Sequence, residues 1–135
     1  MKLTSSEAER DCRDLVVRSI RALDVRDYDV IVGSFALDGA WDRAGELLVG
    51  PAAVREALDK RPANLVTQHL ISNLVVDFAT HDSATVSYTL SAYAQLGAAP
   101  YHLHAIFKAS DRLVQTSEGW KFAHRGVEPA FASAD

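Results

Sequence analysis

Near the middle of the chain runs Thr67-Gln68-His69-Leu70-Ile71-Ser72-Asn73-Leu74-Val75-Val76-Asp77, a segment with the composition of a β-strand. Because side chains alternate along a strand, one face is predicted to carry Leu65, Thr67, His69, Ile71, Asn73 and Val75. The residues between them form the other face, and both faces are mostly apolar. Such a strand is expected inside a sheet that is covered by helices on one side and by more protein on the other.

His69 is the imidazole of this segment, and the pattern places it on a half-buried wall. Burial and a partner for the second ring nitrogen shift the pKa of a histidine, which suits the residue to proton transfer near neutral pH. The alternative is a core histidine whose ring is hydrogen-bonded to a backbone carbonyl. The segment by itself does not separate the two interpretations.

The length and composition are those of one globular domain. The chain has 135 residues, 48% hydrophobic and 24% charged, and is predicted to form one domain over 1–135 with a core of about 5–128. A net charge of −4 without Lys/Arg clusters argues against nucleic acid as a partner. The single cysteine excludes an internal disulfide, and no apolar run reaches the roughly 18 residues of a membrane helix. The first residues lack a signal-peptide pattern, so a cytoplasmic protein is expected.

Helical periodicity dominates the beginning of the sequence. A capping box over 4–7 starts an amphipathic helix that is predicted to end near Asp24. Asp27 is expected to be the N-cap of a second helix, whose apolar pattern continues to Phe35.

The pattern changes to strands in the second half of the chain. Two short extended pieces between 39 and 49, the first with Trp41, precede a third helix that begins at Pro51 and stops by Pro62. Four long antiparallel strands follow, at about 65–78, 82–96, 101–116 and 119–128. Helices followed by hairpin-linked strands predict an α+β fold. Apolar residues on both faces of 65–78 and 82–96 predict a homodimer through the outer sheet face.

Motifs for nucleotide folds and for α/β-hydrolases are absent from the sequence. His102-Leu103-His104 places two imidazoles on one strand face, where they could share a metal, but no third ligand lies nearby in the sequence. We therefore expect neither a metal nor a cofactor, and we interpret His104 as a pocket residue.

Asp24 is the candidate partner of His69. It lies four residues after Ile20 and eight after Val16, so it continues the buried stripe of the first helix. The negative end of the helix dipole and partial burial are both expected to raise the pKa of this carboxyl toward the range of a general base. The alternative is that Asp24 only solvates the turn between two helices.

Further substrate contacts are predicted on the strands, at Asn73, Tyr88, His104, Trp41 and Phe122. Tyr88 and Tyr93 lie on opposite faces by parity, so at most one of them is expected to orient a substrate. Trp120, Phe122 and His124 are predicted to share one face of the last strand, and Lys121, Ala123 and Arg125 the other.

Short motifs complete the pattern: Gly50-Pro51-Ala52-Ala53-Val54, Thr67-Gln68-His69 and Gly119-Trp120-Lys121-Phe122-Ala123-His124-Arg125. With three helices and a bent sheet, over about 5–128, they resemble the SnoaL-like families of the nuclear-transport-factor-like superfamily. The resemblance implies a cystatin-like, cone-shaped barrel in which three N-terminal helices pack on a strongly bent antiparallel sheet around an apolar pocket.

In its chemistry the chain looks most similar to scytalone dehydratase, through Asp24-Val25-Arg26-Asp27-Tyr28-Asp29, Thr67-Gln68-His69 and a His-x-His strand followed by Trp-Lys-Phe-Ala. The resemblance implies that Asp24 and His69 form a pair. Two family tyrosines are replaced, by Leu23 and at or near Arg43, and the family's second histidine, on the strand of 88–95, has no counterpart. A faithful scytalone dehydratase is therefore not expected.

These observations together predict a cofactor-independent lyase (dehydratase) or an isomerase or cyclase that acts on a small hydrophobic cyclic carbonyl compound. His69 would move the proton, Asp24 would hold the imidazole tautomer or act as the base, and Tyr88, Asn73 or His104 could contact an enolate oxygen. The alternative is a non-catalytic cone that binds a small molecule or a partner subunit, like the small subunits of dioxygenases. A cavity with the His and Asp in hydrogen-bond reach would favour the enzyme.

Overall fold

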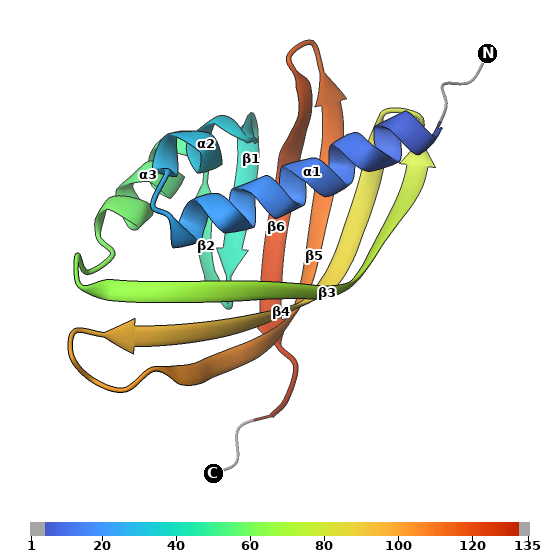
Figure 1. Ribbon diagram of the computed structural model, residues 1–135. Coiled ribbons are helices and arrows are strands. Elements are labelled where there is room, and N and C mark those ends of the chain that lie inside the picture. The colour runs from blue at the N-terminus through green and yellow to red at the C-terminus, as the bar shows by residue number, and fades with distance from the viewer. Residues whose placement is uncertain (1–4, 133–135) are drawn as a thin grey trace.

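The computed structural model describes residues 5–132, within which the chain forms three helices and six strands. The helices are α1 (Ser5–Asp24), α2 (Tyr28–Gly33) and α3 (Pro51–Asp59). The strands are β1 (Phe35–Arg43), β2 (Glu46–Val49), β3 (Leu65–Thr80), β4 (Ser83–Leu96), β5 (His102–Thr116) and β6 (Gly119–Pro129). All strands join one sheet in the order β2-β1-β6-β5-β4-β3, and the helices lie against one face of it (Figure 1). The predicted α+β architecture is confirmed.

The sheet is mixed, although its four long strands are antiparallel as predicted. Hairpins join β3 to β4, β4 to β5 and β5 to β6. The exception is β1, which runs parallel to β6 and antiparallel to β2. Because β1 and β6 are far apart in the sequence, no hairpin constrains their relative direction.

A bulge in β3 reverses the alternation of side chains. Ser72 pairs with Thr89 and Val75 with Ser87, so β3 carries one residue more than β4 between these pairs. Asn73 lies in this bulge with a φ of 55°. The inner face beyond it therefore consists of Leu74, Val76 and Phe78, while Val75 is exposed. The predicted face with Asn73 and Val75 is wrong past Ile71, since a one-residue shift moves every later side chain to the opposite face.

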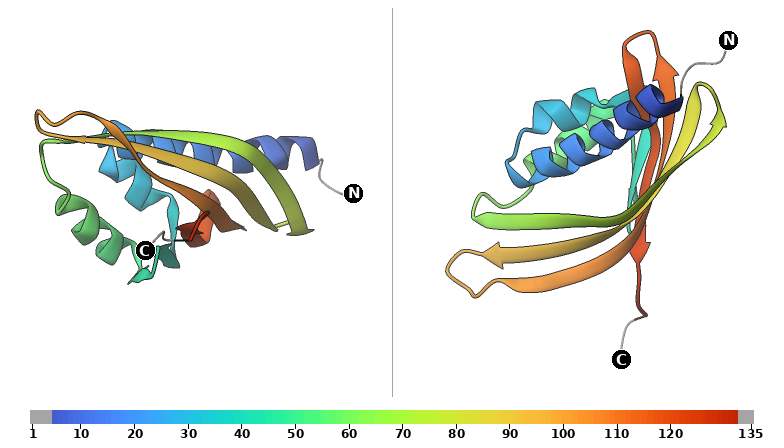
Figure 2. Two further views of the ribbon diagram at one scale, coloured as in Figure 1. Left: turned by 90° about the horizontal axis from the view of Figure 1, so that it is seen from below. Right: turned by 45° about the vertical axis from the view of Figure 1, so that its right-hand side comes forward.

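The next strands contain similar bulges. His104 is the extra residue where β5 pairs with β4, and Ala123 is the extra residue where β6 pairs with β5. Past Ala123 the buried position of β6 passes from Phe122 to Arg125, so the predicted face of Arg125 is wrong as well. Bulges of this kind bend strands, and the long strands curve strongly (Figure 2).

The short helix α2 ends earlier than predicted, at Gly33. The hydroxyl and the backbone N–H of Ser34 both donate to the carbonyl of Ile31 and cap the last turn. Phe35 consequently begins β1 instead of ending the helix. The predicted N-cap position of Asp27 is confirmed, although its side chain makes no capping hydrogen bond.

The core lies between α1 and the concave face of the sheet. Fully buried members come from every layer: Cys12, Val16, Ile31, Val54, Leu58, Val86, Leu113 and Phe122. Thr4, the first residue of the predicted capping box, lies outside the described residues. No helix within 5–132 is long and apolar enough to cross a membrane.

The outer face of β4 is polar. Every second residue from 83 to 91 points outward, and these residues are alternately serine and threonine. The residues between them face the core and are buried: Ala84, Val86, Tyr88, Leu90 and Ala92. The prediction of two apolar faces therefore does not hold for this part of β4. On the edge strand β3, in contrast, Val66, Leu70 and Val75 are 61%, 51% and 51% exposed.

Candidate active site

Asp24 and His69 lie together where the C-terminus of α1 meets β3. Nδ1 of His69 is 2.5 Å from Oδ1 of Asp24, and the backbone N–H of His69 donates to Oδ2 over 2.8 Å. Thr67 Oγ1 donates to Oδ1 over 2.9 Å. The side chains of His69 and Asp24 are only 10% and 11% exposed. The carboxylate is therefore held by three donors from one short stretch of strand.

The electrostatics of Asp24 correct one prediction. Burial raises the pKa of the Asp24 carboxyl, but the side-chain and backbone hydrogen bonds from His69, the charge of that ring and the hydrogen bond from Thr67 together lower the pKa below its usual range. The predicted rise in pKa is wrong because the helix-end position also brings the carboxyl onto these donors. Asp24 is thus an ionised acceptor, to which Nδ1–H of His69 donates. In the neutral form of the ring this tautomer has its lone pair on Nε2.

The same shift predicts how stability depends on pH. A carboxyl with a lower pKa in the folded chain adds stability above its unfolded pKa, and that stability is lost as the pH falls through the folded value. We expect the stability difference between the wild type and Asp24→Asn to be largest above about pH 4 and to shrink in acid. Urea denaturation from pH 3 to 7 measures it. Asp14→Asn, at an exposed position of α1, is the control; a difference for Asp24→Asn that stays constant with pH would contradict the assignment.

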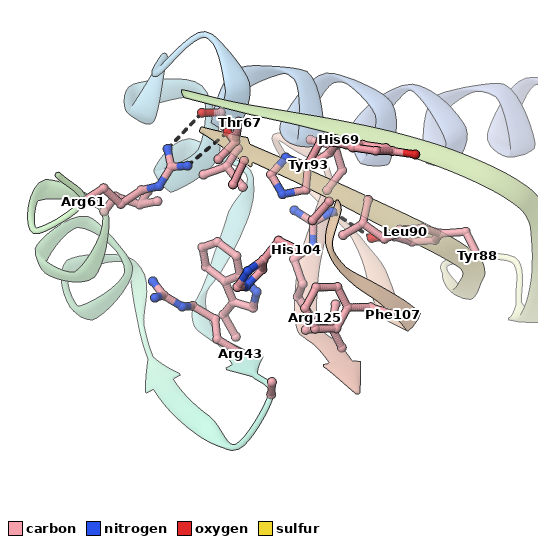
Figure 3. Close-up of a pocket in the computed structure, with 18 residues that line it drawn as sticks. Arg43, Arg61, Thr67, His69, Tyr88, Leu90, Tyr93, His104, Phe107 and Arg125 are labelled. Atoms are coloured by element: carbon pink, nitrogen blue, oxygen red, sulfur yellow. Dashed lines mark hydrogen bonds between the residues drawn. The ribbon is translucent and has the colours of Figure 1, made fainter. Parts of the chain in front are cut away.

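A cavity of about 360 Å³ opens beside the pair (Figure 3). His69 lines it and Asp24 does not, so the imidazole stands between the carboxylate and the cavity. The walls are largely apolar, with contributions from Ile20, Leu23, Leu58, Leu90, Phe107 and Val127. The volume falls in the range of about 300–1,000 Å³ that is usual for small-molecule sites.

Three of the five predicted substrate contacts line this cavity. Trp41, Tyr88 and His104 do so, and His104 is also exposed to solvent. Asn73 does not, because the bulge in β3 turns it to solvent. Phe122 does not either, because it is fully buried in the core, where its ring lies 5.3 Å from that of Phe35.

The hydroxyl of Tyr88 is less available to a substrate than its position in the cavity lining suggests. This hydroxyl donates to Oδ2 of Asp111 over 2.7 Å and accepts from Nη2 of Arg125 over 3.1 Å. Burial raises the pKa of the Tyr88 hydroxyl far above its ordinary range. Tyr93 also lines the cavity, so the two tyrosines do not lie on opposite sides of the sheet as parity predicted. That at most one of them orients a substrate stays a prediction.

A buried ion pair, one member of which lines the cavity, was not predicted from the sequence. Nη2 of Arg125 lies 3.2 Å from Oδ2 of Asp111, with the two side chains 3% and 0% exposed, and Nη1 donates to Ser19 on α1 over 2.8 Å. Burial alone would lower the pKa of Arg125, but the nearby Asp111 and Tyr88 raise it, so the cation is retained. No sequence motif predicts this network, because Arg125 points inward only as a result of the bulge at Ala123.

Two arginines also hold the turn after Asp24 in place through hydrogen bonds. Arg61 donates from Nη1 to the carbonyl of Leu23 over 3.1 Å and from Nη2 to Thr67 over 3.2 Å. Arg26, with a φ of 61°, donates to the carbonyls of Pro62 and Leu65. These bonds tie the end of α1 to the start of β3, which fixes the distance between Asp24 and His69.

Metal ligands do not gather at the site. Within the part of the chain that the structure describes, no three His, Cys, Asp or Glu side chains are grouped so that they could hold an ion. The rings of His102 and His104 are 6.1 Å apart and tilted by 71°. A metal-free protein therefore stays a prediction.

Comparisons with known proteins bear on the fold of the chain. The sequence profile of the SnoaL-like domain family matches residues 4–126. A structure provisionally named scytalone dehydratase, from Novosphingobium aromaticivorans, is 19% identical over 97% of this chain and 89% of its own, with a TM-score of 0.86. Aln2 from a Streptomyces species is 20% identical over 95% of this chain and 94% of its own, with a TM-score of 0.81.

A third similar structure contains a small molecule. It is a Catenulispora acidiphila protein in complex with S-DNPA, 17% identical over 92% of this chain and 94% of its own, with a TM-score of 0.79. No curated protein sequence matches the chain. At these identities the similarity to solved structures establishes the fold and leaves the chemistry to be argued from the site.

Proposed function

Because the chain belongs to the SnoaL-like domain family, we propose that it is an enzyme that moves a proton on a small hydrophobic cyclic carbonyl compound without a cofactor. The observation that carries the proposal is the pair of Asp24 and His69 at the wall of an apolar cavity, with hydrogen-bonded atoms 2.5 Å apart. A buried carboxylate behind an imidazole is the arrangement that makes histidine a base.

The proposed reaction follows from the tautomer of His69 that carries its proton on Nδ1. Nε2 of His69 takes a proton from the carbon next to the substrate carbonyl, and the electron pair moves to the carbonyl oxygen, which becomes an enolate. Asp24 stabilises the imidazolium that forms. The proton then returns to another carbon, as in an isomerase, or leaves with a β-hydroxyl as water, as in a dehydratase. Tyr93 and His104 line the cavity and are the candidate donors to the enolate oxygen, because the hydroxyl of Tyr88 is already used.

Two comparisons support this class of ligand and reaction. The Catenulispora protein is bound to a small molecule, and the Novosphingobium protein carries the name of a dehydratase. The cavity here has the size and apolar walls that such a ligand needs.

Hydrogen exchange tests the proposal without knowledge of the natural substrate. 2-Tetralone and related cyclic ketones are incubated with the protein in D₂O, and NMR follows the loss of the protons next to the carbonyl. We expect exchange above the buffer rate with the wild type and loss of that excess with His69→Asn. Ketones that bind but do not exchange would contradict the enzyme and favour a cone that only binds small molecules.

We further propose that the protein is a homodimer through the outer face of β3. Val66, Leu70 and Val75 form an exposed apolar strip on an edge strand, which is costly for a monomer to leave in water. Light scattering should give twice the chain mass of 14.7 kDa, and Leu70→Lys should lower it. Leu37→Lys, at an exposed position of β1, is the matched control. A wild-type mass of one chain at micromolar concentration would refute the dimer.

A further inference from the structure

The charged side chains that line the cavity are all cationic. Within 5–132, three arginines reach its surface, Arg43, Arg61 and Arg125, and no aspartate or glutamate does. The whole chain, in contrast, has 18 acidic and 14 basic residues. A ligand in the cavity therefore meets a positive lining inside a negatively charged protein.

Two of these arginines are held by the fold. Arg125 is paired with the buried Asp111. Arg61 uses its N–H groups on the carbonyl of Leu23, on the hydroxyl of Tyr28 and on Thr67. Their charge contributes to the electrostatic potential of the cavity, but their N–H groups are already hydrogen-bonded within the protein.

Arg43 is held much less firmly. Its Nη2 lies 3.6 Å from Oε1 of Glu46, beyond ordinary hydrogen-bond distance, and the Glu46 side chain is 61% exposed. The guanidinium carbon lies 5.5 Å from the ring centroid of Trp41, which lines the same cavity. In Figure 3, Arg43 lies on the other side of the cavity from His69. Arg43 therefore has donors to offer at the end of the cavity remote from the proposed base.

We propose that the cavity takes aromatic or other cyclic compounds that carry a carboxylate, with the carboxylate bound by Arg43 and the rings packed against Trp41, Leu90 and Phe107. The parallel N–H groups of a guanidinium match the two oxygens of a carboxylate. The inference names the substrate class of the proposed enzyme and rests on that proposal for the position of the reacting group. Binding is measured without turnover, so the two ideas fail separately.

Isothermal titration calorimetry with 2-naphthoate and 2-naphthamide tests the inference, because the two compounds share their rings and differ in charge. At low ionic strength we expect the wild type to bind the carboxylate about 2 to 5 times more tightly than the amide, which is the range for a partly exposed ion pair. Added NaCl should weaken binding of the carboxylate and leave that of the amide nearly unchanged.

Three variants separate the possible causes. Arg43→Gln should bring the ratio of the two affinities close to one. Arg13→Gln removes a comparable half-exposed arginine, paired with Glu9 on α1 outside the cavity lining, and should keep the wild-type ratio. His69→Asn should also keep the ratio, even where hydrogen exchange is lost. The inference is overturned if the wild type prefers the amide or binds both equally, if neither compound binds, or if Arg43→Gln keeps the full preference.

Discussion

Replacing His69 with Asn is expected to lower the rate of catalysed hydrogen exchange by about 10²–10⁴, because the base that takes the proton is removed. Asp24→Asn is expected to cost a similar factor, since an amide cannot stabilise the imidazolium and does not enforce the tautomer with Nδ1–H. The double variant should be little slower than the slower single variant. Residues that act as one unit are non-additive in this way.

The structure also predicts a difference in stability between the two variants. Asp24 accepts from Thr67 and from the backbone of His69 as well as from the imidazole, so Asp24→Asn disturbs three hydrogen bonds. We expect Asp24→Asn to lose about 1–3 kcal/mol of unfolding free energy and His69→Asn to lose less. Rates are therefore compared well below each melting temperature.

His81→Asn is the matched control for the rate measurements. His81 lies in the turn between β3 and β4, with its side chain 73% exposed, and its replacement should leave exchange unchanged. The pairing of Asp24 with His69 as a catalytic unit is refuted if the losses of the two single variants multiply in the double variant. It is equally refuted if folded His69→Asn exchanges at the wild-type rate.

Arg125→Met is expected to be the most destabilising single change considered, at about 3–5 kcal/mol. The substitution leaves the carboxylate of Asp111 buried without its cation, and burial already raises the pKa of Asp111 above its usual range. It also removes a donor to Ser19 and to Tyr88. Urea denaturation at pH 7 measures the loss.

Removing both charges gives the control. The double variant Arg125→Met with Asp111→Leu should be less destabilised than the sum of the two single variants, because an isolated buried charge costs more than the absent pair. Arg13→Met breaks an exposed ion pair with Glu9 and should cost no more than about 1 kcal/mol. A loss below about 1 kcal/mol for Arg125→Met would mean that the pair is not essential to the fold.

The sequence predicted the elements and the pairing of the long strands because these depend on local periodicity. The 3.6-residue repeat of the first helix placed Asp24 on its buried stripe, and the composition of 65–78 placed His69 on the inner face. His69 precedes the bulge of β3, so parity counted from the start of the strand remained valid for it.

Parity failed for residues that lie beyond a bulge. Asn73 and Arg125 were assigned to the wrong faces because a bulge depends on tertiary curvature and has no clear local signal. The pKa of Asp24 was predicted in the wrong direction for a related reason. The helix dipole and burial can be read from position in the sequence, whereas the donors on β3 come from 43 and 45 residues away.

The bulges at Asn73, His104 and Ala123 also determine how this chain can tolerate gain or loss of single residues. Deleting one residue at a bulge would restore regular pairing locally, but it would turn all later side chains of that strand to the opposite face. In β6 such a deletion would turn Arg125 out of the interior. Asp111 would then stay buried without its cation. Insertions and deletions among relatives of this fold should therefore concentrate in the hairpin turns. A deletion within a strand should be accompanied by a second length change before the next buried residue of that strand.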